Sequence, residues 1–521
     1  ERGSTTGQFR FNSTTGKFEG RNSTGFVAIE ANPIISSVNS SNITQKQIND
    51  GFDLVITGEN FATGDTVKFI GNDSTEYNSP TVTIDSATQI TARVTSSIDS
   101  TKEPYKVKVI SSLGNSGELA SAFNIDAAPA FSTSAGNLGT NEEGSSVNYT
   151  IAATDAEGDA ITFAETGGTV LSTNGLTLAS GGGITGTAPT VSGNTTLSFD
   201  VRATSGTNFT DRTFNIIIAE GPTGGTAGSY SYGGVTYKFN KFTSSTDFVL
   251  GVSKTVDIFV LGGGAGTAGD NAGGGGAGGL IWLANKTLTA GTYAVVVGNG
   301  GTGSAAGGQD SSTNGGNSTF GTILTALGGG YGGTSSVQAA NGGSGGGEGR
   351  ETGSGFTAGT GQQPSQSGDN AGLGNNGGTT QTSGSTGPGS GGGGTGAAGA
   401  NGTSGTVGNG GNGSSTFIST NAAATTAFLL GTVSGTDSSN NATTGSSSGT
   451  LYIGGGGSGG TQDRGSHSGG GTGGLGGGAN IGNSSDGNDA LVNTGSGGSS
   501  TTSGGGTGGN GGSGLVIVRY T

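Results

Sequence analysis

The distribution of glycine constrains this chain more than any other feature of its sequence. Of the 119 glycines in 521 residues, 95 lie after residue 220, where many cluster in runs of two to four. Glycine loses more backbone freedom on folding than any other residue, so such runs predict either a disordered tract or a backbone packed too closely for side chains. Collagen is excluded, because the chain has only 8 prolines and no strict Gly-X-Y repeat.

Strand-like segments at both ends of the glycine-rich half favour the packed alternative over disorder. Val, Ile, Phe and Tyr are frequent at 229–261 and 286–301, and "SGLVIVRYT" closes the chain at 513–521. A disordered tail would not need a closing strand. We therefore predict a β-sandwich, with strands at about 229–300 and 513–521, that carries extended glycine helices (rods) in a polyglycine II lattice. The predicted rods are 273–279, 342–349, 389–399, 454–460 and 469–478.

Backbone hydrogen bonding explains why such rods would pack. An extended helix of about three residues per turn makes no internal hydrogen bonds, so its N–H and C=O groups must bond to neighbours or to water. Without Cβ atoms, several rods can approach closely enough to bond backbone to backbone. We expect side chains in the rods only where they point outward or lie at the edge of a layer.

The order of elements in this half resembles the glycine-rich domains of phage fibre and virion proteins. It runs from an apolar strand through "GGGAG", "GTYAVVVGNGG" and "GGGYGG" to "GGSGLVIVRY", and is similar in kind to polyglycine adhesins at the fibre tips of some phages. The resemblance implies that the segments joining the rods contact a receptor. We expect Trp282, in "GLIWLAN", to be a core or layer-edge residue rather than a platform for a ligand. The candidate receptor-binding residues are Tyr331, Arg350, Phe356, Phe417, Phe428, Tyr452, Arg464 and His467.

Residues 1–31 predict a small β-meander. Aromatic and polar residues alternate in "GQFRFNSTTGKFEG", and "NSTG" marks a second turn before Phe26. This stretch resembles an element of tail-fibre and other virion proteins of marine cyanophages, where it lies at the joints of trimeric fibres. Three short strands cannot bury a core alone, so we expect this segment to pair with other copies, as in a homotrimer, or with another virion protein.

Residues 32–126 and 127–220 each predict an immunoglobulin-like β-sandwich, because short alternating strands are separated by turn residues. The first contains "GFDLVITGENFATGDTVKFIG" and resembles an IPT/TIG domain; the second contains "YTIAATDAEGDAITFAETGG" and "DRTFNIIIA" and resembles a cadherin-like module. In the first, Gly58 and Gly64 are expected at turns. The residues expected to face its core are Leu54, Ile56, Phe61, Val67, Phe69, Val107 and Val109.

The stretch "TDAEGD" is the part of the second module that is most suited to binding a metal ion. Asp155, Glu157 and Asp159 place three carboxylates two residues apart at a strand end, and hard oxygen ligands suit Ca²⁺. Cadherins use a related acidic stretch at domain junctions. Two readings stay open: a calcium site at the junction with the glycine-rich half, and a solvated acidic turn.

Charge and composition exclude several functions. The net charge is −15 with only 10% charged residues, so no basic patch could neutralise nucleic acid phosphates. No apolar run approaches the roughly 20 residues of a membrane span. The chain has no Cys and a single histidine, His467 in "DRGSHSG", without a strained serine turn beside it. We predict no catalytic residues and no enzyme, although a polysaccharide depolymerase needs only two carboxylates and stays an alternative.

The sequence as a whole predicts an all-β protein with an N-terminal β-meander, two immunoglobulin-like sandwiches and a glycine-rich domain. Because it begins with Glu1 and lacks Met, we expect it to be processed or part of a longer chain. The resemblances imply an extracellular phage fibre or tip protein on the virion surface that binds a glycan or protein of the host. Two alternatives are a capsid-decoration or other virion fibre without receptor role, and a cellular surface filament or adhesin subunit assembled by β-strand addition.

Overall fold

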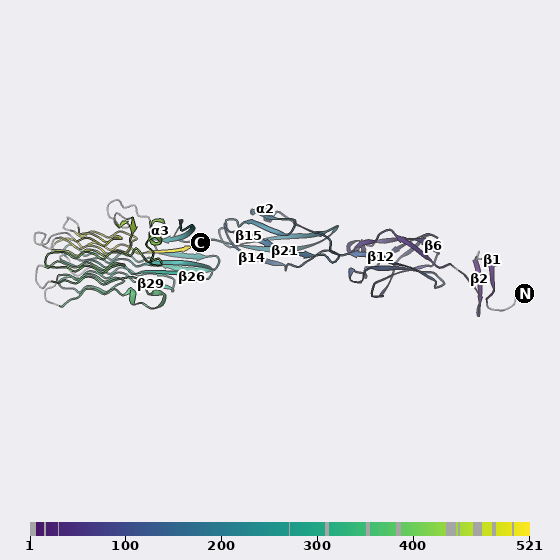
Figure 1. The fold of residues 1–521 in the computed structure, drawn as a ribbon, viewed down its shortest axis with the longest axis horizontal. Helices are drawn as coiled ribbons and strands as arrows, with labels where there is room; N and C mark the ends of the chain where they lie inside the picture. The colour runs from purple at the N-terminus through teal and green to yellow at the C-terminus, as the bar shows by residue number, and fades with distance from the viewer. Residues whose placement is uncertain are drawn as a thin grey trace. The chain divides into compact units, whose positions relative to one another are not determined.

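The computed structural model describes residues 7–14, 17–29, 31–269, 271–307, 312–350, 355–381, 387–433, 444–445, 449–461, 471–481, 486–502 and 505–521. Its contacts divide the chain into two units, Glu1–Ala219 and Glu220–Thr521 (Figure 1). The chain is all-β as predicted, with strands in every predicted module and only short helices among the described residues. None of those helices is both long and apolar enough to cross a membrane.

The N-terminal segment is the predicted three-stranded meander, and its described side chains form no hydrophobic core. Its aromatic side chains lie at the surface: Phe9, Phe11 and Phe18 are 69%, 57% and 64% exposed. Phe11 and Phe18 pair across the strands with ring centroids 5.2 Å apart. The strands, in the order β1-β2-β3, are β1 (Phe9–Asn12), β2 (Lys17–Asn22) and β3 (Gly25–Ala28).

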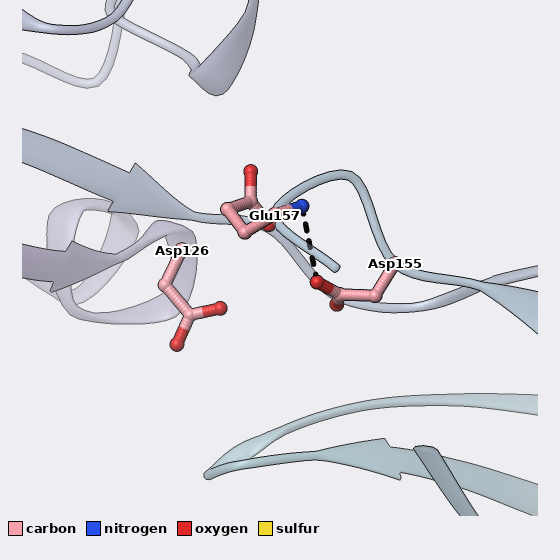
Figure 2. A group of neighbouring side chains, drawn as sticks. All are labelled: Asp126, Asp155 and Glu157. Carbon is pink, nitrogen blue, oxygen red and sulfur yellow. Dashed lines mark hydrogen bonds between the residues drawn. The ribbon is translucent and has the colours of Figure 1, made fainter. Parts of the chain in front are cut away.

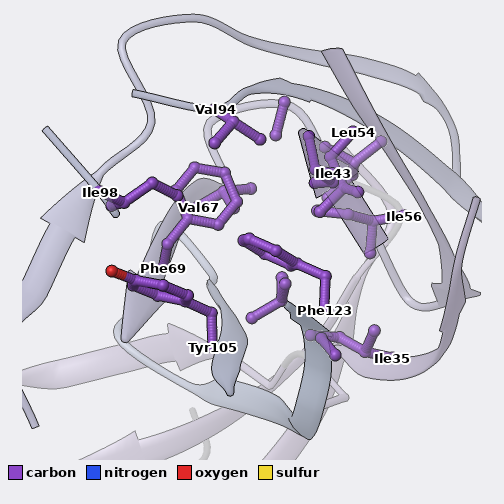
Figure 3. Close-up of a cluster of buried hydrophobic side chains, with 14 of the residues drawn as sticks. Ile35, Ile43, Leu54, Ile56, Val67, Phe69, Val94, Ile98, Tyr105 and Phe123 are labelled. Atoms are coloured by element: carbon purple, nitrogen blue, oxygen red, sulfur yellow. The ribbon is translucent and has the colours of Figure 1, made fainter. Parts of the chain in front are cut away.

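The first sandwich packs two sheets, in the orders β4-β6-β10-β9 and β5-β12-β11-β7-β8. All the residues predicted to face its core are buried, and they pack around Tyr105 and Phe123 (Figure 3). Gly64 lies at a turn with φ of 99°, whereas Gly58 lies inside a strand, where a Cβ would meet the Ile34 carbonyl. The elements are β4 (Ile34–Val38), β5 (Asn42–Thr44), α1 (Gln45–Asp50), β6 (Asp53–Glu59), β7 (Thr66–Ile70), β8 (Glu76–Asn78), β9 (Val82–Ser86), β10 (Gln89–Arg93), η1 (Ser100–Lys102), β11 (Tyr105–Ile110) and β12 (Ser116–Asp126).

The second sandwich consists of the sheets β14-β21-β20-β17 and β15-β19-β18, with the short pair β13-β16. Phe131, Phe199 and Phe214 lie in its core. The elements are β13 (Ala130–Phe131), β14 (Gly136–Glu142), β15 (Ser146–Thr150), β16 (Ala153–Thr154), β17 (Ile161–Thr166), α2 (Val170–Thr173), β18 (Leu176–Leu178), β19 (Gly183–Thr187), β20 (Thr195–Ser205) and β21 (Asn208–Ala219).

The second unit begins with a third sandwich, of sheets β22-β23-β32-β25-β26 and β24-β27-β28-β29. The C-terminal strand β32 lies between β23 and β25, so the predicted closing strand is central in its sheet. Strands β28 and β29 extend the sandwich beyond the predicted range. The elements are β22 (Thr226–Tyr232), β23 (Val235–Phe242), β24 (Thr246–Leu250), β25 (Lys254–Leu261), β26 (Leu280–Leu288), β27 (Gly291–Val296), β28 (Ser318–Phe320), β29 (Leu324–Ala326), η2 (Gln363–Ser365), η3 (Gly368–Asn370), α3 (Ala422–Thr432), β30 (Thr444–Gly445), β31 (Thr450–Leu451) and β32 (Leu515–Tyr520).

The sheet that contains β32 buries both of its faces. One face forms the sandwich core with the second sheet, through Ile258, Val516 and Val518. The other face is covered by α3, whose Phe428 and Leu429 pack against Phe259 and Ile517. This helix was not predicted. It begins at the N-cap Asn421, whose side chain accepts the N–H groups of residues 423 and 424.

The glycine rods are continuations of the strands of this sandwich. Strand β25 leads directly into rod 262–269, and the chain returns along rod 271–279 into β26. The other rods are inserted in the same way between β27 and β28 and between β29 and β32. In Figure 1 they run side by side from the strand ends of the second unit.

Rod 273–279 shows the predicted lattice most fully. Its N–H groups donate in turn to three neighbouring segments, each contacted at every third residue: 327–333, 390–393 and 495–498. Its carbonyl groups, together with that of the preceding Ala272, accept with the same period from 262–265, 344–347 and 457–460. The rod therefore has six neighbours bonded through the backbone, as expected for a helix with three residues per turn. The lattice prediction is confirmed over disorder for the described rods.

Two predicted rods and one packing expectation need correction. Segment 389–399 reverses at 395–397 and forms two antiparallel rods, because Gly394 donates to Ala397 and Gly391 to Ala400. Residues 471–478 of the predicted rod 469–478 are described, and they turn at 475–477. Side chains are not confined to the lattice surface: Ala277 and Ser344 are fully buried. A single small side chain thus fits where it points between rods.

Candidate functional site

The predicted receptor-binding residues that the structure describes do not form one site. Arg350 and Phe356 flank residues 351–354 and are half-buried. Tyr331 is a rod residue, whose N–H donates to the Asn314 side chain at 3.0 Å and whose carbonyl accepts from Ala340 at 3.0 Å. Tyr452 lies between β31 and rod 454–460. Arg464 and His467 lie outside the described residues.

Two of the aromatic candidates belong to the hydrophobic core. Phe428 is fully buried on α3, and Phe417 is 8% exposed beside it, with ring centroids 5.8 Å apart. Both pack against Phe259 of β25. The prediction that both residues lie on an exposed binding loop is therefore wrong. Helix α3 covers the sheet, and Phe417 and Phe428 make the contact with it.

One described reversal of the rods, at 403–406 on the end remote from the sandwich, is a short polar turn. In the turn at 403–406, the backbones of Thr403 and Thr406 exchange hydrogen bonds of 3.0 and 3.2 Å, and Ser404 and Gly405 are exposed. Such turns are held by rods whose backbones are bonded to their neighbours. This arrangement can present side chains in a fixed geometry.

An acidic cluster is the second candidate site. Asp126, Asp155 and Glu157 each have a carboxylate oxygen within 4.8 Å of those of the other two (Figure 2). Asp155 Oδ1 accepts the N–H groups of Glu157 and Asp159, both at 3.1 Å, which shapes the turn after β16. Glu157 Oε2 accepts the Ala127 N–H at 3.1 Å.

The cluster differs from the prediction in one ligand and in its place. Asp126, at the end of β12, joins Asp155 and Glu157, whereas the Asp159 carboxylate is not in the group. Asp126 is far away in the sequence, so local spacing could not identify it. Its carbonyl accepts the Asn208 side chain at 2.9 Å, at the start of β21, whereas Ala219 ends that strand. The cluster thus lies where the chain enters the second sandwich, and the predicted junction with the glycine-rich half is wrong.

Burial and neighbouring carboxylates raise pKa values in this cluster. Burial raises the pKa of Asp126, and the charges of Asp159 and Asp155 raise it further. Burial also raises the pKa of Glu157, with added effects of Asp155 and Glu103. Asp126 Oδ1 and Asp155 Oδ2 are buried and have no hydrogen-bond partner among the described residues. Buried, partnerless oxygens of this kind fit a hard cation such as Ca²⁺.

Comparisons with solved structures find proteins of low sequence identity. The solved structures that resemble the chain include "Crystal structure of DIP-gamma IG1+IG2" (11% identity, TM-score 0.24, 36% of this chain and 99% of that chain). They also include "I-band fragment I67-I69 from titin" (8%, TM-score 0.26, 44% and 80%) and "Drosophila OTK, extracellular domains 3-5" (13%, TM-score 0.21, 37% and 64%). No curated protein matches the sequence.

The family comparison covers the larger part of the chain. The family described as "Glycine-rich domain" matches residues 240–521. That range begins in β23 and ends with the last residue, so it includes most of the third sandwich and all of the rods. The chain therefore belongs to the glycine-rich domain family.

Proposed function

We propose that this chain is a phage virion fibre or fibre-tip protein whose glycine-rich domain attaches to a host surface. The observation that carries the proposal is the rod lattice. A backbone bonded to six neighbours is a rigid scaffold, and binding residues are often found on loops held by such scaffolds. The role is one of binding rather than catalysis.

The N-terminal segment supports attachment to a larger particle. Its three strands expose Phe9, Phe11 and Phe18 and have no core to cover them. Such a segment is suited to pairing with other copies, as in a homotrimer, or with another virion protein. A cellular filament assembled by strand addition would use the same segment, and neighbouring genes and particle imaging distinguish the two.

Adsorption measurements test the attachment role. Purified full-length chain should bind host cells and compete with particles for adsorption. Phe356→Ala, at a half-buried position a few residues after rod 342–349, should weaken binding while stability changes by no more than about 0.5 kcal/mol, as at other surface positions. Thr292→Val, an exposed change on β27, is the control. Absence of competition by the wild-type chain would leave a structural fibre or capsid-decoration role as the better proposal.

A further inference from the structure

A pocket of about 680 Å³ opens in the second unit beside β26, the edge strand of the five-stranded sheet. Trp282 of β26 forms one wall, together with Leu373 from segment 371–375, which pairs with Leu280 of the same strand. Segment 414–420, which precedes α3, also lines the pocket. The volume is in the range of small-molecule sites, about 300–1,000 Å³.

The ring of Trp282 is held in place by aromatic and cationic neighbours. The Arg519 guanidinium lies 4.8 Å from the ring centroid, and the Phe428 ring meets it edge-on at 5.2 Å. Phe417 contacts it at 5.9 Å and also lines the pocket. Trp282 remains only half-buried. It therefore packs at the edge of the hydrophobic core, as predicted, and also presents a fixed aromatic surface to the pocket.

The described lining of the pocket mixes polar and apolar residues. None of the lining residues that the structure describes is acidic or basic. Asn375 donates from its side chain to the Gly394 carbonyl at 2.8 Å, which orients the amide and leaves its oxygen as an acceptor. Thr416 and Ser419 are exposed, and their hydroxyls form no hydrogen bond to the described residues. Charge thus disfavours an ionic ligand, and the free donors and acceptors disfavour a purely apolar one.

The wall formed by segment 414–420 has an unusual backbone. Ser419 and Thr420 have φ values of 48° and 55°, and a β-branched residue is rarely found in this left-handed region. Two successive non-glycine residues in this region cost conformational energy, and backbone strain of this kind is concentrated at ligand-binding sites. Here both strained residues line the pocket.

We propose that this pocket binds a neutral saccharide, with a sugar ring stacked on Trp282. The C–H groups on one face of a pyranose carry partial positive charge and suit the electron-rich face of the indole. The sugar hydroxyls would exchange hydrogen bonds with Asn375, Thr416 and Ser419. The inference rests on the proposed attachment function for the source of the sugar, but places recognition beside the sandwich rather than at the rod turns.

Tryptophan fluorescence offers a direct test, because Trp282 is the only tryptophan in the chain. Full-length protein is titrated with maltotriose, mannotriose, chitotriose and lactose, and is applied to an array of neutral glycans. We expect at least one of these sugars to produce a saturable change in emission. The proposal is overturned if no sugar changes the emission and none binds on the array. It is also overturned if a proline-rich peptide, titrated in the same way, is the only ligand that changes the emission.

Variants then locate the binding. Thr416→Val removes one hydroxyl from the pocket and should weaken the sugar about tenfold, the equivalent of one hydrogen bond. Trp282→Phe, measured by calorimetry, should weaken it more. Thr292→Val removes an exposed hydroxyl on β27, away from the pocket, and should leave binding unchanged. Equal affinity of Thr416→Val, Trp282→Phe and wild type overturns the site.

The proposed function and this site can fail separately. If the chain binds sugar but does not compete for host adsorption, the attachment role fails and the pocket stands. If the chain competes for adsorption but binds no neutral sugar, the pocket is wrong and the role stands. Competition abolished by the same sugar that quenches Trp282 supports both.

Discussion

At the scale of single residues, the lattice is determined by where a Cβ atom has no room. At Gly275, a Cβ would lie within 3.0 Å of the Ala265 carbonyl oxygen, a distance that real Cβ atoms essentially never show. At Gly505, a Cβ would meet nothing within 4 Å. The two positions look alike in the sequence, since each lies in a glycine run. Only the structure distinguishes them.

Gly275→Val should therefore destabilise the second unit by about 1–3 kcal/mol or more, because overpacking forces bonded backbones apart. Gly456→Val should behave in the same way, since its Cβ would meet the Gly392 carbonyl. Thermal or denaturant unfolding measures the change. Gly505→Ala is the control and should be close to neutral. Equal tolerance at all three positions would contradict the lattice.

Ser458 provides a test in the opposite direction. It is fully buried in rod 454–460, and its hydroxyl has no hydrogen-bond partner among the described residues. A buried polar group without a partner costs about 1–3 kcal/mol. Ser458→Ala keeps the Cβ that the lattice already accommodates and removes this cost, so the melting temperature should rise. A fall would show that the hydroxyl is bonded, for example to water.

Tyr105 gives the first sandwich a dependence on alkaline pH. Burial raises its pKa to about 12, and the hydroxyl donates to the Asp99 carbonyl at 2.9 Å. Since the folded state holds this proton more tightly than the unfolded state, the stabilisation is complete below about pH 10 and is lost as the pH rises towards about 12. The slope should approach 1.4 kcal/mol per pH unit. Tyr105→Phe should unfold with a shallower slope in that range, and an unchanged slope would reject this assignment.

At the scale of elements, the sequence predicted strands better than it predicted what covers them. Alternation identified the inward pairs Leu54–Ile56 and Val67–Phe69, because period-two burial is a local property. It could not identify α3, whose role depends on Phe428 meeting a sheet face formed by distant strands. For the same reason, the sequence could not show what surrounds Trp282, because its neighbours Arg519 and Phe428 are remote in the chain.

The closing strand β32 should be indispensable for its sheet. Its side chains enter both cores, with Val516 and Val518 on one face and Leu515 and Ile517 on the other. A chain ending at residue 514 should therefore lose the cooperative unfolding transition of the second unit, as followed by circular dichroism and limited proteolysis. Survival of that transition would mean that the rods hold the unit without the sandwich.

Removal of residues 1–31 is the matched truncation at the other end. Since the meander contributes no buried core of its own, the three sandwiches should melt as before. Assembly into particles should be lost, as measured by incorporation and by the oligomeric state of the purified chain. Normal assembly of the truncated protein would contradict the role proposed for this segment.

At the scale of the whole chain, composition predicted the two units but not how sites are assembled across modules. The acidic cluster depends on Asp126 from one sandwich meeting a turn of the next. We expect that chelation lowers the melting temperature of the first unit, because a cation bound only to the folded state stabilises it. Asp126→Ala should remove this effect and Asp159→Ala should retain it. An identical melt with and without chelator would reject calcium here.

The insertion of rods as excursions from strand ends has a consequence for how such chains change in length. Every excursion leaves the sandwich and must come back to the same end, as 262–269 and 271–279 do between β25 and β26. With a single extra rod, the chain would reach the far side of the lattice and could not continue into the next strand of the sandwich. Insertions and deletions among related chains should therefore occur in out-and-back pairs. Designers could widen the lattice by the same step and leave the sandwich sequence untouched.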